Sequence, residues 1–157
     1  MTDPQLYKKV ANHLTGRDIE LHFVKPYIKG ARGCAIKKNG KPVIFVDPVL
    51  DEEQKLKTFL HECAHVAAPS WVKMAENRER DFTPGRLDLA GQLRPVEEII
   101  RPMEKDAEAI SKGWFEYATN RYDDLRQINR KANFYIYGFC PGRSIEDLLK
   151  ILMEWKG

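Results

Sequence analysis

The sequence predicts an α+β fold in a single domain, and three local patterns support this. Residues 51–68 combine a helix-capping start with apolar residues at helical spacing. Asn39 and Gly40 separate two short apolar runs, which is typical of a β-hairpin. A second helix is expected over residues 102–118. We therefore expect a small sheet with a hairpin packed against these two helices.

The N-terminal residues predict one helix followed by one strand. Thr2 or Asp3 can cap a helix that has Pro4 at its first turn, where proline is well tolerated, and that stops at Gly16. Residues 19–23 then alternate between apolar and polar side chains, which indicates a half-buried strand. In the hairpin, residues 34–36 and 43–46 form the strands, and Pro42 is tolerated beside the turn.

The helix after the hairpin begins with Asp51 as the N-cap and Gln54 three residues later, and Pro69 ends it because proline lacks the N–H that a helix needs. Glu52 and Glu53 suit the positive N-terminal end of the helix. Its apolar face contains Leu56, Phe59, Leu60, Cys63, Val66 and Ala67. This helix is expected to be half buried.

The rest of the chain is expected to contain a long loop and a helical C-terminal extension. Residues 70–101 hold Pro84, Gly85, Gly91 and Pro95 among mixed charges, which predicts a long loop or insertion with room for a short helix. This loop either covers a cleft or is a surface excursion. Residues 119–157 are expected to form the extension, in which Ser144 caps a final helix. That helix has an apolar face that packs on the core or mediates dimerisation.

Length and composition limit the function classes. The chain has 157 residues, the size of one ordinary domain, and its 26 Lys and Arg against 23 Asp and Glu make nucleic acid an unlikely direct ligand. Cys34, Cys63 and Cys140 have no C-x-x-C spacing, which argues against a disulfide framework. There is no secretion signal or membrane-spanning run in the sequence, so a cytoplasmic protein is expected.

The most informative motif is H-E-x-x-H, formed by His61, Glu62 and His65. Helix positions four apart lie on one face, so both imidazoles can bind one Zn²⁺ while Glu62 reaches a water molecule at the metal. This pattern is typical of zinc metallopeptidases. The alternative is a helix on which these three side chains merely face solvent or pair with neighbours.

The third metal ligand is expected to be a carboxylate. A catalytic zinc site needs three protein ligands, and the other histidines are only His13 and His22, both of which precede the motif and fit surface positions. The position six residues after His65 is Trp71, which excludes the extended three-histidine motif.

Glu104 is the best candidate for this ligand. On the helix 102–118, it begins a stripe of mostly small or apolar residues that continues with Ala107, Ser111, Trp114 and Ala118. A carboxylate directed into a core needs a partner, and a metal ion would provide one. Glu108, one turn later, is the competing ligand or a second-shell partner of a histidine ligand.

The order of these features resembles the ImmA/IrrE family of zinc metallopeptidases over about residues 1–118. The segments N-G-K-P-V-I-F-V-D, L-H-E-C-A-H and E-K-D-A-E-A-I carry the resemblance. It implies a zincin-like fold and places the family's glutamate ligand on Glu104. It also implies a protein or peptide substrate, such as a helix-turn-helix repressor of a phage or mobile element. In zincins, the strand before the motif helix forms the edge that binds the substrate, which here implies residues 43–46. The alternative is that these residues form an ordinary core strand.

The sequence therefore predicts a zinc-dependent peptidase with His61, His65 and Glu104 as ligands and Glu62 as the general base. A second donor for the oxyanion could be a tyrosine, and the sequence does not choose among Tyr117, Tyr122, Tyr135 and Tyr137. The alternative function is a non-catalytic zincin-fold protein that binds a partner or has a structural role in a phage or mobile element.

Overall fold

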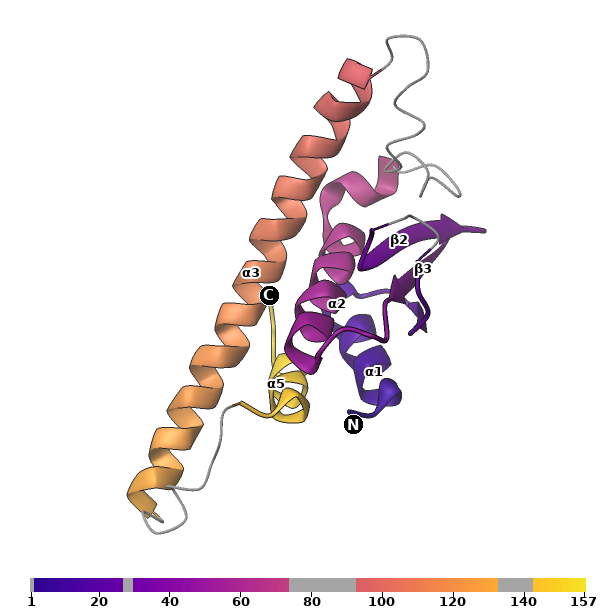
Figure 1. Ribbon diagram of the computed structural model, residues 1–157. Coiled ribbons are helices and arrows are strands. Elements are labelled where there is room, and N and C mark those ends of the chain that lie inside the picture. Colours follow the sequence, from indigo (N-terminus) through magenta and orange to yellow (C-terminus); the bar gives the residue numbers. More distant parts are fainter. Residues whose placement is uncertain (1, 27–29, 74–92, 133–142) are drawn as a thin grey trace.

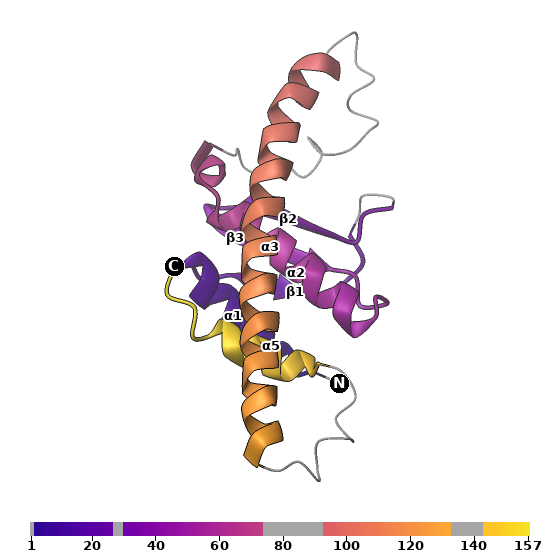
Figure 2. The ribbon, with the colours of Figure 1, turned by 90° about the vertical axis from the view of Figure 1, so that its left-hand side faces the viewer.

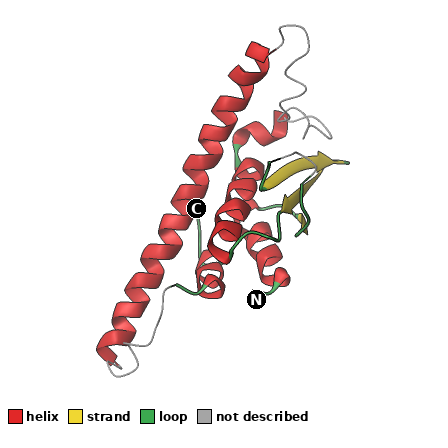
Figure 3. Ribbon diagram, in the orientation of Figure 1, coloured by secondary structure: helices red, strands yellow, loops and turns green. Residues whose placement is uncertain are grey.

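The computed structural model describes residues 2–26, 30–73, 93–132 and 143–157. These residues form α1 (Pro4–Thr15), β1 (Glu20–His22), β2 (Gly33–Lys38), β3 (Lys41–Val46), α2 (Glu52–Ala67), a 3-10 helix η1 (Pro69–Lys73), α3 (Leu93–Ala132) and α5 (Ile145–Leu152). The mixed α+β class expected from the sequence is confirmed (Figure 3).

Helix α2 lies at the centre of the molecule. Figure 1 shows α2 between the sheet on one side and the long helix α3 on the other. In the view turned by 90° in Figure 2, α3 crosses in front of α2 and the sheet. Helix α2 contacts β2, β3, α1, α3 and α5. The buried side chains of α2 are therefore positioned by packing on several sides.

The three strands form one sheet in the order β1-β3-β2. Strands β2 and β3 are antiparallel, and the turn between them has positive φ at both Asn39 (52°) and Gly40 (75°), so the predicted hairpin is confirmed. The expectation that residues 43–46 form an edge strand is wrong, because β1 pairs in parallel with β3 along these residues. The edge strand of the hairpin is β2.

The predicted helix caps are confirmed. The Asp3 carboxylate accepts a hydrogen bond from the Gln5 N–H at 2.9 Å, and Gly16 ends α1 with a left-handed φ of 68°. The Asp51 carboxylate accepts from the Gln54 N–H at 2.8 Å, and α2 ends immediately before Pro69. These caps satisfy N–H groups that have no partner within the helix, so they fix where the helices begin.

Helix α3 is longer than predicted. It begins at Leu93, so residues 93–101 are helical and Pro102 lies within the helix instead of at its first turn. Residues 70–73 belong to η1, whereas Pro84, Gly85 and Gly91 lie outside the described residues. Within the described ranges, no helix is both long and apolar enough to cross a membrane.

One hydrophobic cluster joins the helices to the sheet. Ala107, Trp114 and Ala118, from the predicted stripe of α3, are at most 4% exposed and belong to this cluster. Helix α5 belongs to the same cluster and contacts α1 and α3. The final helix of the predicted C-terminal extension therefore packs on the core. Other fully buried members are Tyr7, Val10, Ile19, Ile44, Leu56, Phe59, Leu60, Leu148, Leu149 and Leu152.

We predict that Asp51→Ala lowers the free energy of unfolding by about 1 kcal/mol, because the Gln54 N–H loses its cap. Urea unfolding followed by circular dichroism measures this change. Asp51→Asn keeps a capping oxygen and is expected to retain most of the stability. Equal losses in the two variants would contradict the capping role.

Candidate metal centre

The two histidines of the motif lie side by side on α2. They are one helical turn apart, and their ring centroids are 4.8 Å apart with nearly perpendicular ring planes. His65 is almost buried, with 9% of its side chain exposed, whereas His61 is 27% exposed. The pair is therefore held by the core on one side and open to a cavity on the other.

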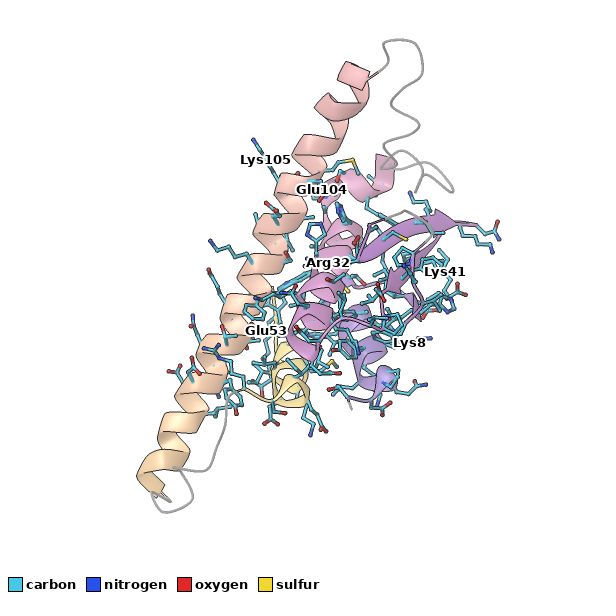
Figure 4. The ribbon with its side chains drawn as sticks, viewed as in Figure 1. Lys8, Arg32, Lys41, Glu53, Glu104 and Lys105 are labelled. Atoms are coloured by element: carbon cyan, nitrogen blue, oxygen red, sulfur yellow. The ribbon has the colours of Figure 1, made fainter. Side chains whose placement is uncertain are left out.

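Glu104 on α3 completes the arrangement. Its Oε2 lies 2.9 Å from His61 Nε2, and its Oε1 lies 3.0 Å from His65 Nε2. Figure 4 shows Glu104 on the side of α3 that faces α2, while Lys105 points away. The packing of Ala107 and Trp114 into the core accounts for this orientation, because residues three or four apart share a helix face.

The electrostatics of the cluster favour an ionised carboxylate. Hydrogen bonds from His61 and His65 lower the pKa of Glu104 to about 2, and the hydrogen bond to Glu104 in turn raises the pKa of His61. Glu104 is therefore a carboxylate at neutral pH. An ionised carboxylate and neutral imidazoles are the forms in which these side chains bind metals.

The three side chains fit a metal ion. Their ligand atoms all lie within 4.8 Å of one another. A tetrahedral ion with bonds of about 2.0–2.2 Å holds its ligand atoms roughly 3.4 Å apart, so small rotations of these side chains suffice. The ligand atoms are two imidazole nitrogens and one carboxylate oxygen. This combination favours a transition metal ion over Mg²⁺ or Ca²⁺, because Mg²⁺ and Ca²⁺ prefer oxygen ligands alone.

Glu62 lies beside these ligands at the wall of the same cavity. The cavity has a volume of about 500 Å³ and is lined by residues 30–35, by the face of α2 that contains His61, Glu62 and His65, and by Glu104. Glu62 is only 6% exposed, and burial raises the pKa of its carboxyl group. A carboxyl group with a raised pKa accepts a proton more readily than an ordinary one.

Gly33 allows α2 to approach β2 closely at this point. A Cβ atom at this position would lie 2.7 Å from Thr58 Cγ2, 2.9 Å from the Phe45 carbonyl oxygen and 3.1 Å from Glu62 Cγ. Gly33 was not predicted from the sequence as part of the site, although a glycine within a strand can indicate that another part of the chain approaches its backbone closely. The absence of a side chain here is what leaves room for Glu62.

The environment of Glu104 differs in one respect from the sequence-based expectation. Its side chain is 41% exposed, so it lies at the rim of the cavity instead of within the core. Glu108, the competing ligand, is exposed, and in the described part of the chain its side chain forms no hydrogen bond with either histidine. Its charge nevertheless contributes to the raised pKa of His61.

Tyr117 and Tyr122, the two candidate oxyanion donors among the described residues, do not contact the metal cluster. Tyr117 packs on Trp155, with ring centroids 5.0 Å apart, and it lies about 20 Å along α3 from Glu104 at 1.5 Å per residue. Tyr122 lies still further along the same helix. Tyr135 and Tyr137 lie outside the described residues.

The remaining histidines have other contacts. His13 Nε2 lies 2.6 Å from the Trp155 carbonyl oxygen, and His22 Nε2 lies 3.1 Å from Glu20 Oε2. Neither residue lines the metal-site cavity or belongs to a metal-binding group of the described residues.

Comparison of the chain with protein-family models, with curated proteins and with solved structures found no match. The functional argument therefore depends on the geometry and chemistry of the site. Among the described residues, His61, His65 and Glu104 form the one group of histidine, cysteine and acidic side chains that could hold a metal ion.

We predict that the purified chain binds one metal ion and that Glu104→Ala weakens its affinity by more than about 100-fold, since even second-shell changes cost about 10–100-fold. Competition with a chromophoric chelator measures the affinity. Glu108→Ala is the matched control, because it removes the same charge one turn away and is expected to retain the ion. Full occupancy in Glu104→Ala would exclude Glu104 as a ligand.

We also predict that Gly33→Ala lowers the free energy of unfolding by about 1–3 kcal/mol, because the new methyl group overlaps Thr58 and a backbone oxygen. Gly113→Ala in α3 is the control, since its Cβ would meet no atom within 4 Å, and it is expected to leave stability unchanged or raise it. Guanidinium unfolding compares the two. No loss in Gly33→Ala would contradict the close approach.

Proposed function

We propose that this chain is a zinc-dependent metallopeptidase in which His61, His65 and Glu104 hold Zn²⁺ and Glu62 is the general base. The observation that carries the proposal is the convergence of Glu62 and three metal-binding side chains on one cavity. The H-E-x-x-H motif and the resemblance to the ImmA/IrrE family support the same function.

The donor set favours a catalytic zinc site over a structural one. Structural zinc sites usually have four protein ligands, whereas catalytic sites have three and keep one position open. Here the described residues supply three donors, and both His61 and Glu104 remain partly exposed to the cavity. A buried carboxyl group such as Glu62 beside the ligands also has no function in a purely structural site.

The chemistry of peptide hydrolysis can be assigned to these groups. Zinc held by His61, His65 and Glu104 would lower the pKa of bound water toward about 7 and polarise the scissile carbonyl group. Glu62 would accept a proton from the attacking water and then donate it to the leaving amine. Burial raises the pKa of Glu62, which makes its carboxylate a stronger base than an exposed one.

The position of β2 supports an extended peptide as the substrate. Strand β2 is an edge of the described sheet, and its first residues, 33–35, line the cavity beside the metal ligands. An extended peptide can pair with the backbone of an edge strand. We therefore propose β2 as the peptide-binding edge. A helix-turn-helix repressor as the substrate is a hypothesis by family analogy alone.

A peptide library prepared from a digested bacterial proteome tests the activity without a known substrate. The zinc-loaded protein is incubated with the library, and new N-termini are identified by mass spectrometry. We expect new termini that disappear when a chelator removes the metal. A zinc-loaded protein that produces no new termini would contradict the proposal.

We predict that Glu62→Gln lowers kcat/KM by about 10²–10⁴-fold while it retains the metal, because glutamine cannot accept the proton. The rate is measured on a peptide identified in the library, and zinc content is measured on the same samples. Full activity in Glu62→Gln would show that another group is the base.

A further inference from the structure

A second, smaller cavity adjoins the metal-site cavity. It has a volume of about 290 Å³ and lies between α2 and α3, where it is lined by Leu60, Ser111, Lys112 and Phe115. Lys57 and His61 line both cavities. The two cavities therefore meet at one face of α2, next to a metal ligand.

The two cavities contain three cationic side chains beside the candidate metal site. Glu62 and Glu104 are the acidic side chains of that site, and the other charged side chains that line the two cavities in the described residues are Arg32, Lys57 and Lys112. Outside the candidate metal site, the charged groups of the described cavity walls are therefore cations.

Lys57 occupies the central position among the three cations. It precedes His61 by four residues, so the two side chains are neighbours on α2, with Cβ atoms about 6 Å apart. Its Nζ lies 5.2 Å from the centre of the Phe115 ring on α3, which holds the ammonium group at the junction of the two cavities. Its ion pair with Glu53, at 3.2 Å, is about half exposed and therefore weak.

Arg32 lines the metal-site cavity, and Lys112 lines the smaller cavity. Arg32 donates a hydrogen bond from its Nη1 atom to Gln54 Oε1 at 3.0 Å and lies beside α2 (Figure 4). A guanidinium group has five N–H donors, so this contact leaves donors for a carboxylate. On α3, Lys112 Nζ lies 3.9 Å from Glu116 Oε1, and this pair is weak because the two side chains are 77% and 60% exposed.

We propose, on the basis of the proposed peptidase function, that the substrate carries an acidic side chain within about two residues of the scissile bond and that Lys57 recognises it. An extended peptide advances about 3.3 Å per residue, so a side chain one or two residues from the bond reaches the turn of α2 that contains Lys57. Arg32 or Lys112 provides a second positive charge, depending on the side of the bond that carries the acid.

Matched peptides test this specificity. A cleaved peptide from the library is synthesised with Asp, Asn or Lys at each position within two residues of the bond. We expect the zinc-loaded wild type to prefer Asp over Asn by about tenfold in kcat/KM at one of these positions, and this preference to weaken at high salt. Equal rates for Asp and Asn at every position would overturn the inference but leave the peptidase function intact.

Variants at position 57 assign the recognition to one residue. Lys57→Gln is expected to abolish the preference for Asp, and Lys57→Glu is expected to shift it toward Lys. The control is Lys41→Glu on β3, which changes the same charge on the sheet, well separated from Glu104 in Figure 4. It is expected to behave as the wild type. An unchanged preference in Lys57→Gln with full zinc content would overturn the role of Lys57.

A binding measurement separates this inference from catalysis. Zinc-loaded Glu62→Gln is titrated with fluorescent Asp and Asn peptides, and anisotropy reports the dissociation constants. Tighter binding of the Asp peptide by about tenfold, lost in the Glu62→Gln, Lys57→Gln double variant, supports acidic recognition even if no hydrolysis occurs. Equal binding of both peptides would overturn it, whereas absent hydrolysis by the wild type contradicts the proposed function.

Discussion

The packing of α3 against α2 is the interaction on which the candidate site depends. The ligand atoms come from residues 43 positions apart in the chain, His61 and Glu104, and only contact between the two helices brings them together. Ala107, Trp114 and Ala118 of α3 are buried in the hydrophobic cluster that α2 also joins. The same hydrophobic packing that stabilises the fold therefore also assembles the three side chains that could hold a metal ion.

Two carboxyl groups in this site have opposite environments. Glu104 accepts hydrogen bonds from two imidazoles at the rim of the cavity, and its pKa falls to about 2. Glu62 is buried against β2, and its pKa rises. When the surroundings of two neighbouring acids give them different pKa values, the two acids can have different roles. In the proposed peptidase, the ionised group binds the metal and the buried group moves the proton.

Local patterns in the sequence predicted much of this arrangement. The caps at Asp51 and Gly16, the Asn39-Gly40 turn and the spacing of His61 and His65 depend on residues within one turn of each other, so they can be recognised without the fold. Glu104 was identified because the chain has few histidines and one suitable helical stripe. The pairing of β1 with β3 is a long-range contact, so local patterns did not decide between an edge strand and a core strand for residues 43–46. The prolines in α3 obscured its true start at Leu93.

The central claim is that three side chains from two helices hold one zinc ion. Anomalous diffraction at the zinc edge, from crystals of the zinc-loaded protein, tests it most directly. We predict one strong anomalous peak, from a zinc ion that lies about 2.0–2.2 Å from His61 Nε2, His65 Nε2 and a Glu104 oxygen. A peak elsewhere, or an ion bound without Glu104, would contradict it.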